Sequence, residues 1–121
     1  MNWQFSNDAP IYAQLIRQIR AGIVSGAFSP GERLPSVRDL AMEAGVNPNT
    51  MQRALAELER TGLVYTQRTA GRFVTEDAAV VDSAKQELAH QQIGAFLHRM
   101  ERMGYDREQT AQLVRSWEEE A

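Results

Sequence analysis

The chain has 121 residues with a formal net charge of −3, and it is 43% hydrophobic, 24% charged and free of cysteine. This length allows one domain or a domain with a small appendage, and the lack of cysteine excludes a disulfide framework, a thiolate metal site and a cysteine nucleophile. No stretch approaches the roughly 20 apolar residues of a membrane span, and the N-terminus lacks a signal-peptide pattern, so we expect a cytoplasmic protein.

The first helix is predicted from about Pro10 to Ser25. Proline is favourable in the first turn of a helix, and Gly26 ends the pattern. Large apolar residues recur at every fourth position and form one broad face for a core, namely Ile11, Leu15, Ile19 and Ile23. A turn is predicted at Ser29–Glu32. Pro35 then keeps Leu34 extended just before the next helix.

The stretch Leu34–Thr61 predicts two short helices joined by a tight turn, the arrangement of a helix-turn-helix. Ser36 and Asp39 have the spacing of a capping box at the start of its first helix, and Gly45 supplies the left-handed residue that ends that helix. Asn47 is placed to cap the second helix.

The second helix of this pair has an inward apolar stripe and an outward polar face. The stripe is formed by Met51, Ala54, Leu55 and Leu58. The exposed N-terminus and the opposite face carry Asn49, Thr50, Gln52 and Arg53. Such side chains suit the base edges and phosphates of DNA, so the pattern favours a recognition helix, with a plain helical hairpin as the alternative.

A short β-hairpin is predicted directly after this helix. Leu63–Thr66 alternates as a strand should, Gln67–Gly71 has the composition of a turn, and Arg72–Thr75 forms the returning strand. Arginines flank the tip on both sides. A hairpin in this position is a wing, and the combination is far more specific for DNA binding than either part alone.

Residues 10–75 closely resemble the winged-helix domain of the GntR family of bacterial transcription regulators. The matching segments are PIYAQLIRQIRAGIVSGAFSPGERLPSVRDLA, GVNPNTMQRALAELERTGLVYT and GRFV. The short C-terminal part is similar to that of the YtrA subfamily. The resemblance implies a mainly α fold with a small β-hairpin, in which residues 1–75 form a winged helix-turn-helix and residues 76–121 a helical dimerisation domain.

The residues expected to contact DNA follow partly from the predicted geometry and partly from the resemblance. In members of the family, the arginine in the second helix, here Arg38, usually contacts DNA. The polar residues at the start of the recognition helix usually do so as well. A glycine at the wing tip lets the backbone approach the minor groove with an arginine beside it. The expected DNA-binding residues are Arg33, Ser36, Arg38, Asn47, Asn49, Thr50, Gln52, Arg53, Arg68, Gly71 and Arg72.

Some of these residues have a purely structural alternative. Ser36 and Asn47 would each serve as a helix cap without touching DNA. Arg53 could pair with Glu57 four residues further on and remain a solvated surface residue. The residues alone leave these alternatives open.

The net charge divides unevenly along the chain. Residues 1–75 carry eight arginines against six acidic residues, a net charge of +2, whereas residues 76–121 carry five basic against ten acidic residues, a net charge of −5. The basic excess therefore lies where contact with phosphates is expected. An excess of only +2 predicts modest affinity for a single copy and favours a dimer.

The C-terminal part predicts a long helix from about Asp77 to Met103 and a last helix that begins at Asp106, with Gln109 completing the cap. Two such helices cannot enclose a core, so we expect an antiparallel pair that docks on a second copy across a two-fold axis. The expected interface residues are Leu88, Ile93, Phe96, Leu97, Met100, Leu113, Val114 and Trp117. Packing back onto the same chain's winged helix is the alternative.

The C-terminal part raises two further questions, an effector site and a metal site. Aromatic and methionine side chains could line a cavity for a small apolar effector at the dimer interface, although such residues more often form plain core. The candidates are Phe96, Met100, Met103, Tyr105 and Trp117. His90 and His98 are separated by a helical rise of about 12 Å, too far for one ion, so no metal or cofactor is expected.

No nucleophile–base pair or hydrolase motif is visible, so an enzyme is not expected. The sequence predicts a homodimeric transcription regulator, a repressor by resemblance, that binds an inverted-repeat operator in double-stranded DNA. The competing hypothesis is a winged-helix module that binds another protein and has no sequence-specific DNA binding.

Overall fold

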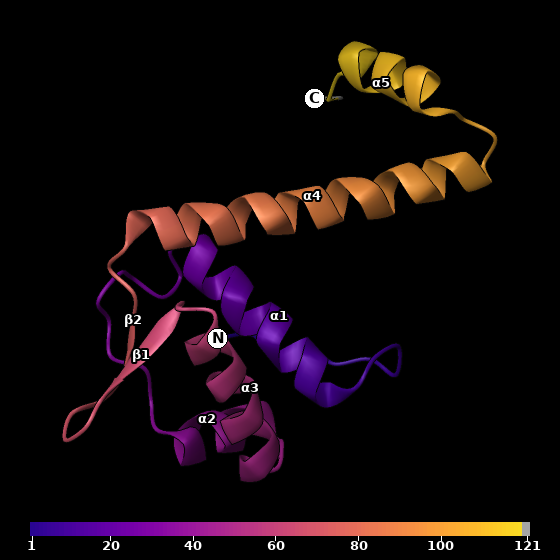
Figure 1. Cartoon of the computed structure of the whole chain (residues 1–121). Helices are drawn as coiled ribbons and strands as arrows, with labels where there is room; N and C mark the ends of the chain where they lie inside the picture. Colours follow the sequence, from indigo (N-terminus) through magenta and orange to yellow (C-terminus); the bar gives the residue numbers. More distant parts are fainter. Residues whose placement is uncertain (120–121) are drawn as a thin grey trace. The chain divides into compact units, whose positions relative to one another are not determined.

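The computed structural model describes residues 1–119 (Figure 1). The chain forms two compact units, Met1–Lys85 and Gln86–Ala121. The elements in chain order are α1 (Ile11–Val24), α2 (Val37–Ala44), α3 (Pro48–Arg60), β1 (Val64–Gln67), β2 (Gly71–Val74), α4 (Ala78–Arg102) and α5 (Arg107–Ser116). This confirms the predicted fold class, mainly α with one small β-hairpin.

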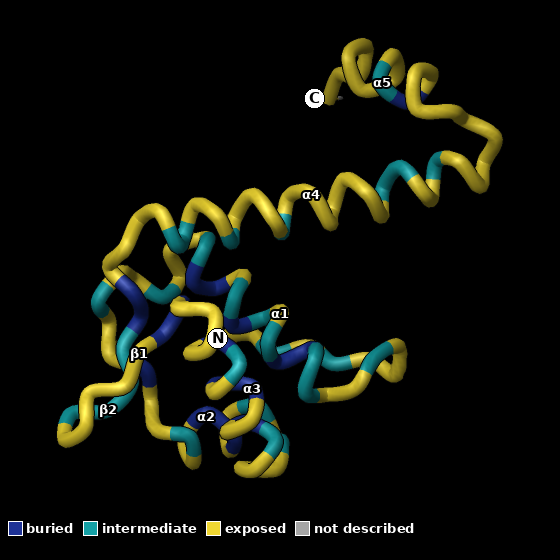
Figure 2. The backbone as a smooth tube through the Cα atoms, in the orientation of Figure 1, coloured by how far each residue is buried: buried dark blue, intermediate teal, exposed yellow. Residues whose placement is uncertain are grey.

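The core of the first unit lies between α1, α2, α3 and the base of the hairpin (Figure 2). Helix α3 packs against both α1 and α2, and its predicted inward stripe is buried. The largest fully buried side chains of the unit are Leu15, Ile19, Met51, Leu55, Leu58, Leu63, Val64 and Val74. Ile11 was expected on the core face but is 37% exposed, because it stands at the very start of α1.

The two helices of the helix-turn-helix begin and end where local chemistry requires. The side chain of Ser36 accepts a hydrogen bond from the Asp39 backbone N–H at 3.1 Å, but the Asp39 carboxylate makes no return bond, so only half of the expected capping box is formed. Gly45 ends α2 with φ at 72°, a conformation that costs other residues strain. Asn47 caps α3 through the Asn49 N–H at 2.8 Å.

The hairpin pairs β1 with β2 in antiparallel register, from Val64 opposite Val74 to Gln67 opposite Gly71. A third extended segment lies beside β2. The Leu34 N–H donates to the carbonyl oxygen of Arg72, and the Val74 N–H donates to the carbonyl oxygen of Glu32, both at 2.9 Å. This segment was expected to be only an extended linker, because three residues are too few to show a strand pattern.

The first ten residues run as an extended segment along α1. The Gln14 amide bonds the backbone of Ser6 and Ala9, and the Gln18 amide bonds the backbone N–H and carbonyl of Gln4. The N-terminal ammonium and the Trp3 indole donate to the Glu43 carboxylate on α2, and these hydrogen bonds lower the pKa of Glu43. The segment therefore ties α1 to α2.

The beginning of α4 belongs structurally to the first unit. Val80, Val81 and Ala84 pack against the core that α1 to α3 form. The division after Lys85 therefore lies ten residues beyond the expected boundary after residue 75. The composition shift at Glu76 marks the end of the wing rather than the end of the packed unit.

The second unit contains the rest of α4 and helix α5. Gly104, with φ at 95°, turns the chain between them, and Asp106 with Gln109 forms a complete capping box at the start of α5. No residue of α4 is buried, and Thr110 is the buried residue of α5. Several large apolar side chains are exposed, among them Ile93 at 56%, Val114 at 57% and Trp117 at 70%.

An apolar groove of about 590 Å³ lies between α4 and α5 in this unit, lined by Phe96, Met100, Leu113, Val114, Ser116 and Trp117. The expected cavity residues Met103 and Tyr105 do not line it. They belong to the turn between the helices, whereas the groove is lined by side chains of α4, of α5 and of Trp117 directly after α5.

No helix among residues 1–119 is long and apolar enough to cross a membrane. The same residues contain no group of three or more His, Cys, Asp or Glu side chains placed to hold a metal ion.

Candidate DNA-binding surface

The N-terminal half of α3 presents polar side chains outward. Because Met51, Ala54, Leu55 and Leu58 occupy the buried stripe, the positions between them point away from the core. Asn49 and Gln52 are exposed and Thr50 is half-buried at the start of the helix. The backbone N–H groups of this turn add a partial positive charge.

Arg53 does not pair with Glu57. Its guanidinium lies over the ring of Tyr12 on α1, with the Cζ atom 4.5 Å from the ring centroid. Glu57 instead binds Arg60, whose Nε atom donates to the carboxylate at 3.0 Å, and this hydrogen bond lowers the pKa of Glu57. The predicted ion pair between Arg53 and Glu57 is therefore wrong, because Arg53 lies against Tyr12 instead.

The start of α2 lies beside the wing. Ser36 and Arg38 are exposed there, and the guanidinium of Arg33 covers Gly71 so closely that a Cβ atom at Gly71 would lie 3.1 Å from Arg33 Nε. Gly71 also has φ at 110°, which other residues rarely adopt. A groove of about 240 Å³ separates the wing from the start of α2, lined by Arg33, Leu34, Pro35, Ser36, Val37, Thr66, Gly71 and Arg72.

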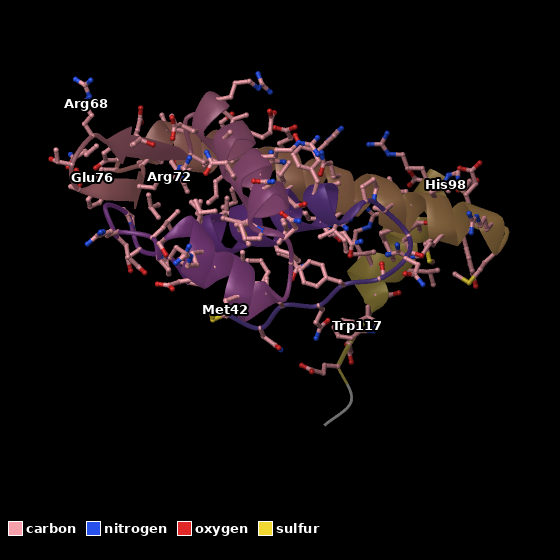
Figure 3. All side chains as sticks on the ribbon, turned by 90° about the horizontal axis from the view of Figure 1, so that it is seen from below. Met42, Arg68, Arg72, Glu76, His98 and Trp117 are labelled. Carbon is pink, nitrogen blue, oxygen red and sulfur yellow. The ribbon has the colours of Figure 1, made fainter. Side chains whose placement is uncertain are left out.

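The two arginines that flank the wing tip have different surroundings (Figure 3). Arg68 is exposed and projects beyond the tip of the hairpin. Arg72 lies between the hairpin and α3, and only 19% of its side chain is exposed. The expected set therefore contains one wing arginine open to solvent and one that is largely covered.

Arg72 connects the wing to the recognition helix. Its Nη1 atom donates to the Gln52 amide oxygen at 3.4 Å, and its Nε atom lies 3.5 Å from a carboxylate oxygen of Glu59. The same oxygen of Glu59 accepts a hydrogen bond from the Thr66 hydroxyl on β1. Sequence reasoning missed Glu59 and Thr66, because no local spacing relates a strand residue to a helix residue.

The surface thus combines an exposed polar helix N-terminus, arginines around the start of α2, and a wing bonded to the flank of α3. These groups donate hydrogen bonds and carry positive charge, which fits contacts with phosphates and base edges. The fold and this surface together define a winged helix-turn-helix DNA-binding domain.

The sequence profile described as "Bacterial regulatory proteins, gntR family" matches residues 11–74, and the chain belongs to this family. It is 38% identical over 119 residues to the uncharacterized HTH-type transcriptional regulator YhcF of Bacillus subtilis (strain 168), covering 98% of each chain. It is 43% identical over 72 residues to the HTH-type transcriptional repressor YtrA of the same organism, covering 60% of this chain and 55% of YtrA. This match supports the YtrA-like assignment.

Solved structures agree with the family. A GntR family transcriptional regulator from Listeria monocytogenes superposes with a TM-score of 0.83 at 38% identity, covering 94% of this chain and all of that one. The DNA-binding domain of AraR in complex with operator ORR3 superposes with a TM-score of 0.53 at 29% identity, over 62% of this chain and 88% of that one. The protein is a DNA-binding transcription regulator and not an enzyme.

Proposed function

We propose that the protein is a homodimeric repressor that binds an inverted-repeat operator in double-stranded DNA. In each subunit the start of α3 enters the major groove and the tip of the wing lies against the adjacent minor groove. The observation that carries this proposal is the exposed polar N-terminus of α3, which no other element of the first unit covers.

The residues divide into two kinds of contact. Asn49, Thr50 and Gln52 stand where base edges would pass and are the proposed readers of sequence. The others are proposed to contact phosphates or the minor-groove edge and to set the register of the domain on the duplex. They are Arg33, Ser36, Arg38, Asn47, Arg53, Arg68 and Gly71.

The dimer is supported by the second unit, whose helices leave large apolar side chains exposed in the single chain. Monomeric proteins rarely expose contiguous apolar surface of this kind without a partner. A second copy is the occupant proposed for the expected interface residues on α4 and α5. Repression, rather than activation, is proposed because two relatives, YtrA and NagR of B. subtilis, are named transcriptional repressors.

A small effector is the remaining part of the proposal. The apolar groove between α4 and α5 has a volume within the usual range for ligand pockets, roughly 300–1,000 Å³. A small apolar molecule in this groove would contact the same helices that are proposed to form the dimer, and so would alter the spacing of the two DNA-binding units.

Selection of binding sites from a random double-stranded pool, followed by footprinting, tests the proposal. A palindromic site with half-sites about one helical turn apart, protected symmetrically, is the expected result. Retention that is abolished by moderate salt and shows no sequence preference would favour the protein-binding module instead.

Two arginine variants sharpen this test. Arg38→Ala is expected to weaken binding to the selected site about tenfold, because one charged contact at the duplex is lost. Arg17→Ala is the matched control, since Arg17 is also exposed but lies on α1, away from the proposed surface. Equal losses in the two variants would contradict the assignment of Arg38.

A further inference from the structure

Gln52 is held from outside the recognition helix. Its amide oxygen accepts a hydrogen bond from Nη1 of Arg72, a residue of the wing. A guanidinium has five N–H donors and no acceptor. The amide can therefore present only its oxygen to Arg72, and its NH₂ group must be directed elsewhere.

Arg72 is held in turn by the far end of the same helix. Glu59 lies seven residues after Gln52, two helical turns along α3, and its carboxylate faces the Arg72 Nε atom at 3.5 Å. That Nε atom is buried and has no hydrogen-bond partner among residues 1–119, so the Glu59 charge is what compensates it there. The Thr66 hydroxyl fixes the carboxylate from β1.

We propose that Arg72 is a positioning residue that fixes the Gln52 amide so that its N–H donors face the major groove. The inference rests on the proposed function, because it takes the start of α3 to lie in that groove. It also changes the expected role of Arg72, which acts through Gln52 rather than as a wing contact with DNA.

The orientation of the amide selects a base. In the major groove guanine offers two acceptors, N7 and O6, whereas adenine offers the acceptor N7 and the donor N6–H₂. A glutamine that is free to turn matches adenine, because its oxygen and its NH₂ group can form a bidentate pair with that base. A glutamine whose oxygen is turned toward Arg72 directs its NH₂ donors into the groove and matches guanine. We therefore expect guanine opposite Gln52 in each half-site.

The experiment measures base preference rather than affinity alone. The position that Gln52 faces is identified as the one whose preference disappears in Gln52→Ala. Affinities of the full-length variants are then measured on four duplexes that differ only at this base pair, and on a duplex with 7-deazaguanine there. The wild type is expected to prefer guanine and to lose affinity on 7-deazaguanine, which lacks the N7 acceptor.

Arg72→Met is the informative variant. Removing the guanidinium frees the amide oxygen, so the ratio of guanine to adenine affinity is expected to move about tenfold toward adenine. Glu59→Gln keeps an acceptor for Thr66 but loses the charge that holds Arg72, and a smaller shift in the same direction is expected. A merely structural role for Arg72 would lower affinity without changing this ratio.

Arg68→Met is the matched control, since Arg68 is also a wing arginine but is exposed and unbonded to α3. It should weaken binding to all four duplexes equally, as loss of a phosphate contact does. Thermal unfolding of each variant shows whether it is folded. If Arg72→Met does not fold, the shift in base preference is measured in Glu59→Gln alone.

Three results would overturn the inference alone. They are an equal loss on all four duplexes in Arg72→Met, a wild-type preference for adenine opposite Gln52, and a Gln52→Ala variant that keeps every base preference. A wild-type protein that selects no site at all would overturn the proposed function, and the inference with it.

Discussion

Asn47 combines two tasks at one position. Its side-chain oxygen caps α3 through the Asn49 N–H, while its NH₂ group remains at an exposed turn of the proposed DNA surface. Asparagine, aspartate and serine are all good N-caps, whereas alanine is not. Stability and DNA affinity can therefore be separated by the choice of substitution.

Asn47→Ala is expected to lower the free energy of unfolding by about 1 kcal/mol, because the cap is lost. Asn47→Ser should unfold like the wild type but bind the operator several-fold more weakly, since it caps the helix without offering the amide donors. Urea unfolding and operator titration of the two variants measure these effects. If Asn47→Ser binds as tightly as the wild type, Asn47 is a cap and nothing more.

Helix caps are predictable from the local sequence, and side-chain partners on different elements are not. The caps at Ser36, Asn47 and Asp106 follow from the residue type and the helix start, and the structure contains all three. The ring of Tyr12 beneath Arg53 lies on another helix. Nothing in the local pattern singles out such a pair, because only tertiary packing brings it together.

At the scale of elements, the apolar stripes were sufficient to predict α1, α2 and α3, because each stripe repeats with the helical period and packs against the same core.

The wing differs from the helices, because a third extended segment pairs with its two strands. The segment 32–34 pairs with β2 across a sequence gap of about forty residues, as the Leu34–Arg72 hydrogen bond illustrates. Pairing at that distance depends on the fold and leaves no trace in a three-residue segment.

The turn between α2 and α3 depends on Gly45. A Cβ atom there would meet nothing within 4 Å, so substitution adds backbone strain without a steric clash. Gly45→Ala is expected to lower the free energy of unfolding by roughly 1–2 kcal/mol, and Gly45→Asn by less, because asparagine tolerates the left-handed conformation better.

Gly94 provides the control for this prediction. It also has open space around its Cα atom, but it lies inside α4 with ordinary helical geometry. Gly94→Ala should leave stability unchanged or raise it by roughly 0.5–1 kcal/mol. A Gly45→Ala variant as stable as Gly94→Ala would contradict the requirement for a left-handed residue in the turn.

The whole molecule consists of two units with opposite chemistry. The first encloses a core and carries the proposed DNA surface, whereas the second buries almost none of its own apolar side chains. The sequence predicted this contrast from charge and helix length. It could not place the structural boundary, because the core contacts of Val80, Val81 and Ala84 continue the first unit into α4.

Dimerisation through the second unit can be tested at Val114. Val114 is 57% exposed in the single chain, so an aspartate there should cost the folded monomer little. In the proposed dimer the same carboxylate would be buried against apolar side chains without a partner, which is strongly unfavourable. Val114→Asp is therefore expected to raise the dimer dissociation constant at least tenfold, as measured by sedimentation velocity over a range of concentrations.

The effect on DNA follows from the symmetry of the operator. A dimer gains from the second half-site because the two units are linked, and a monomer does not. Val114→Asp should thus bind an isolated half-site like the wild type and lose affinity for the full inverted repeat. Gln112→Asp, on the same helix but outside the groove, should leave both the dimer and the operator complex intact. A wild-type chain that sediments as a monomer at high concentration would remove the dimer from the proposed function.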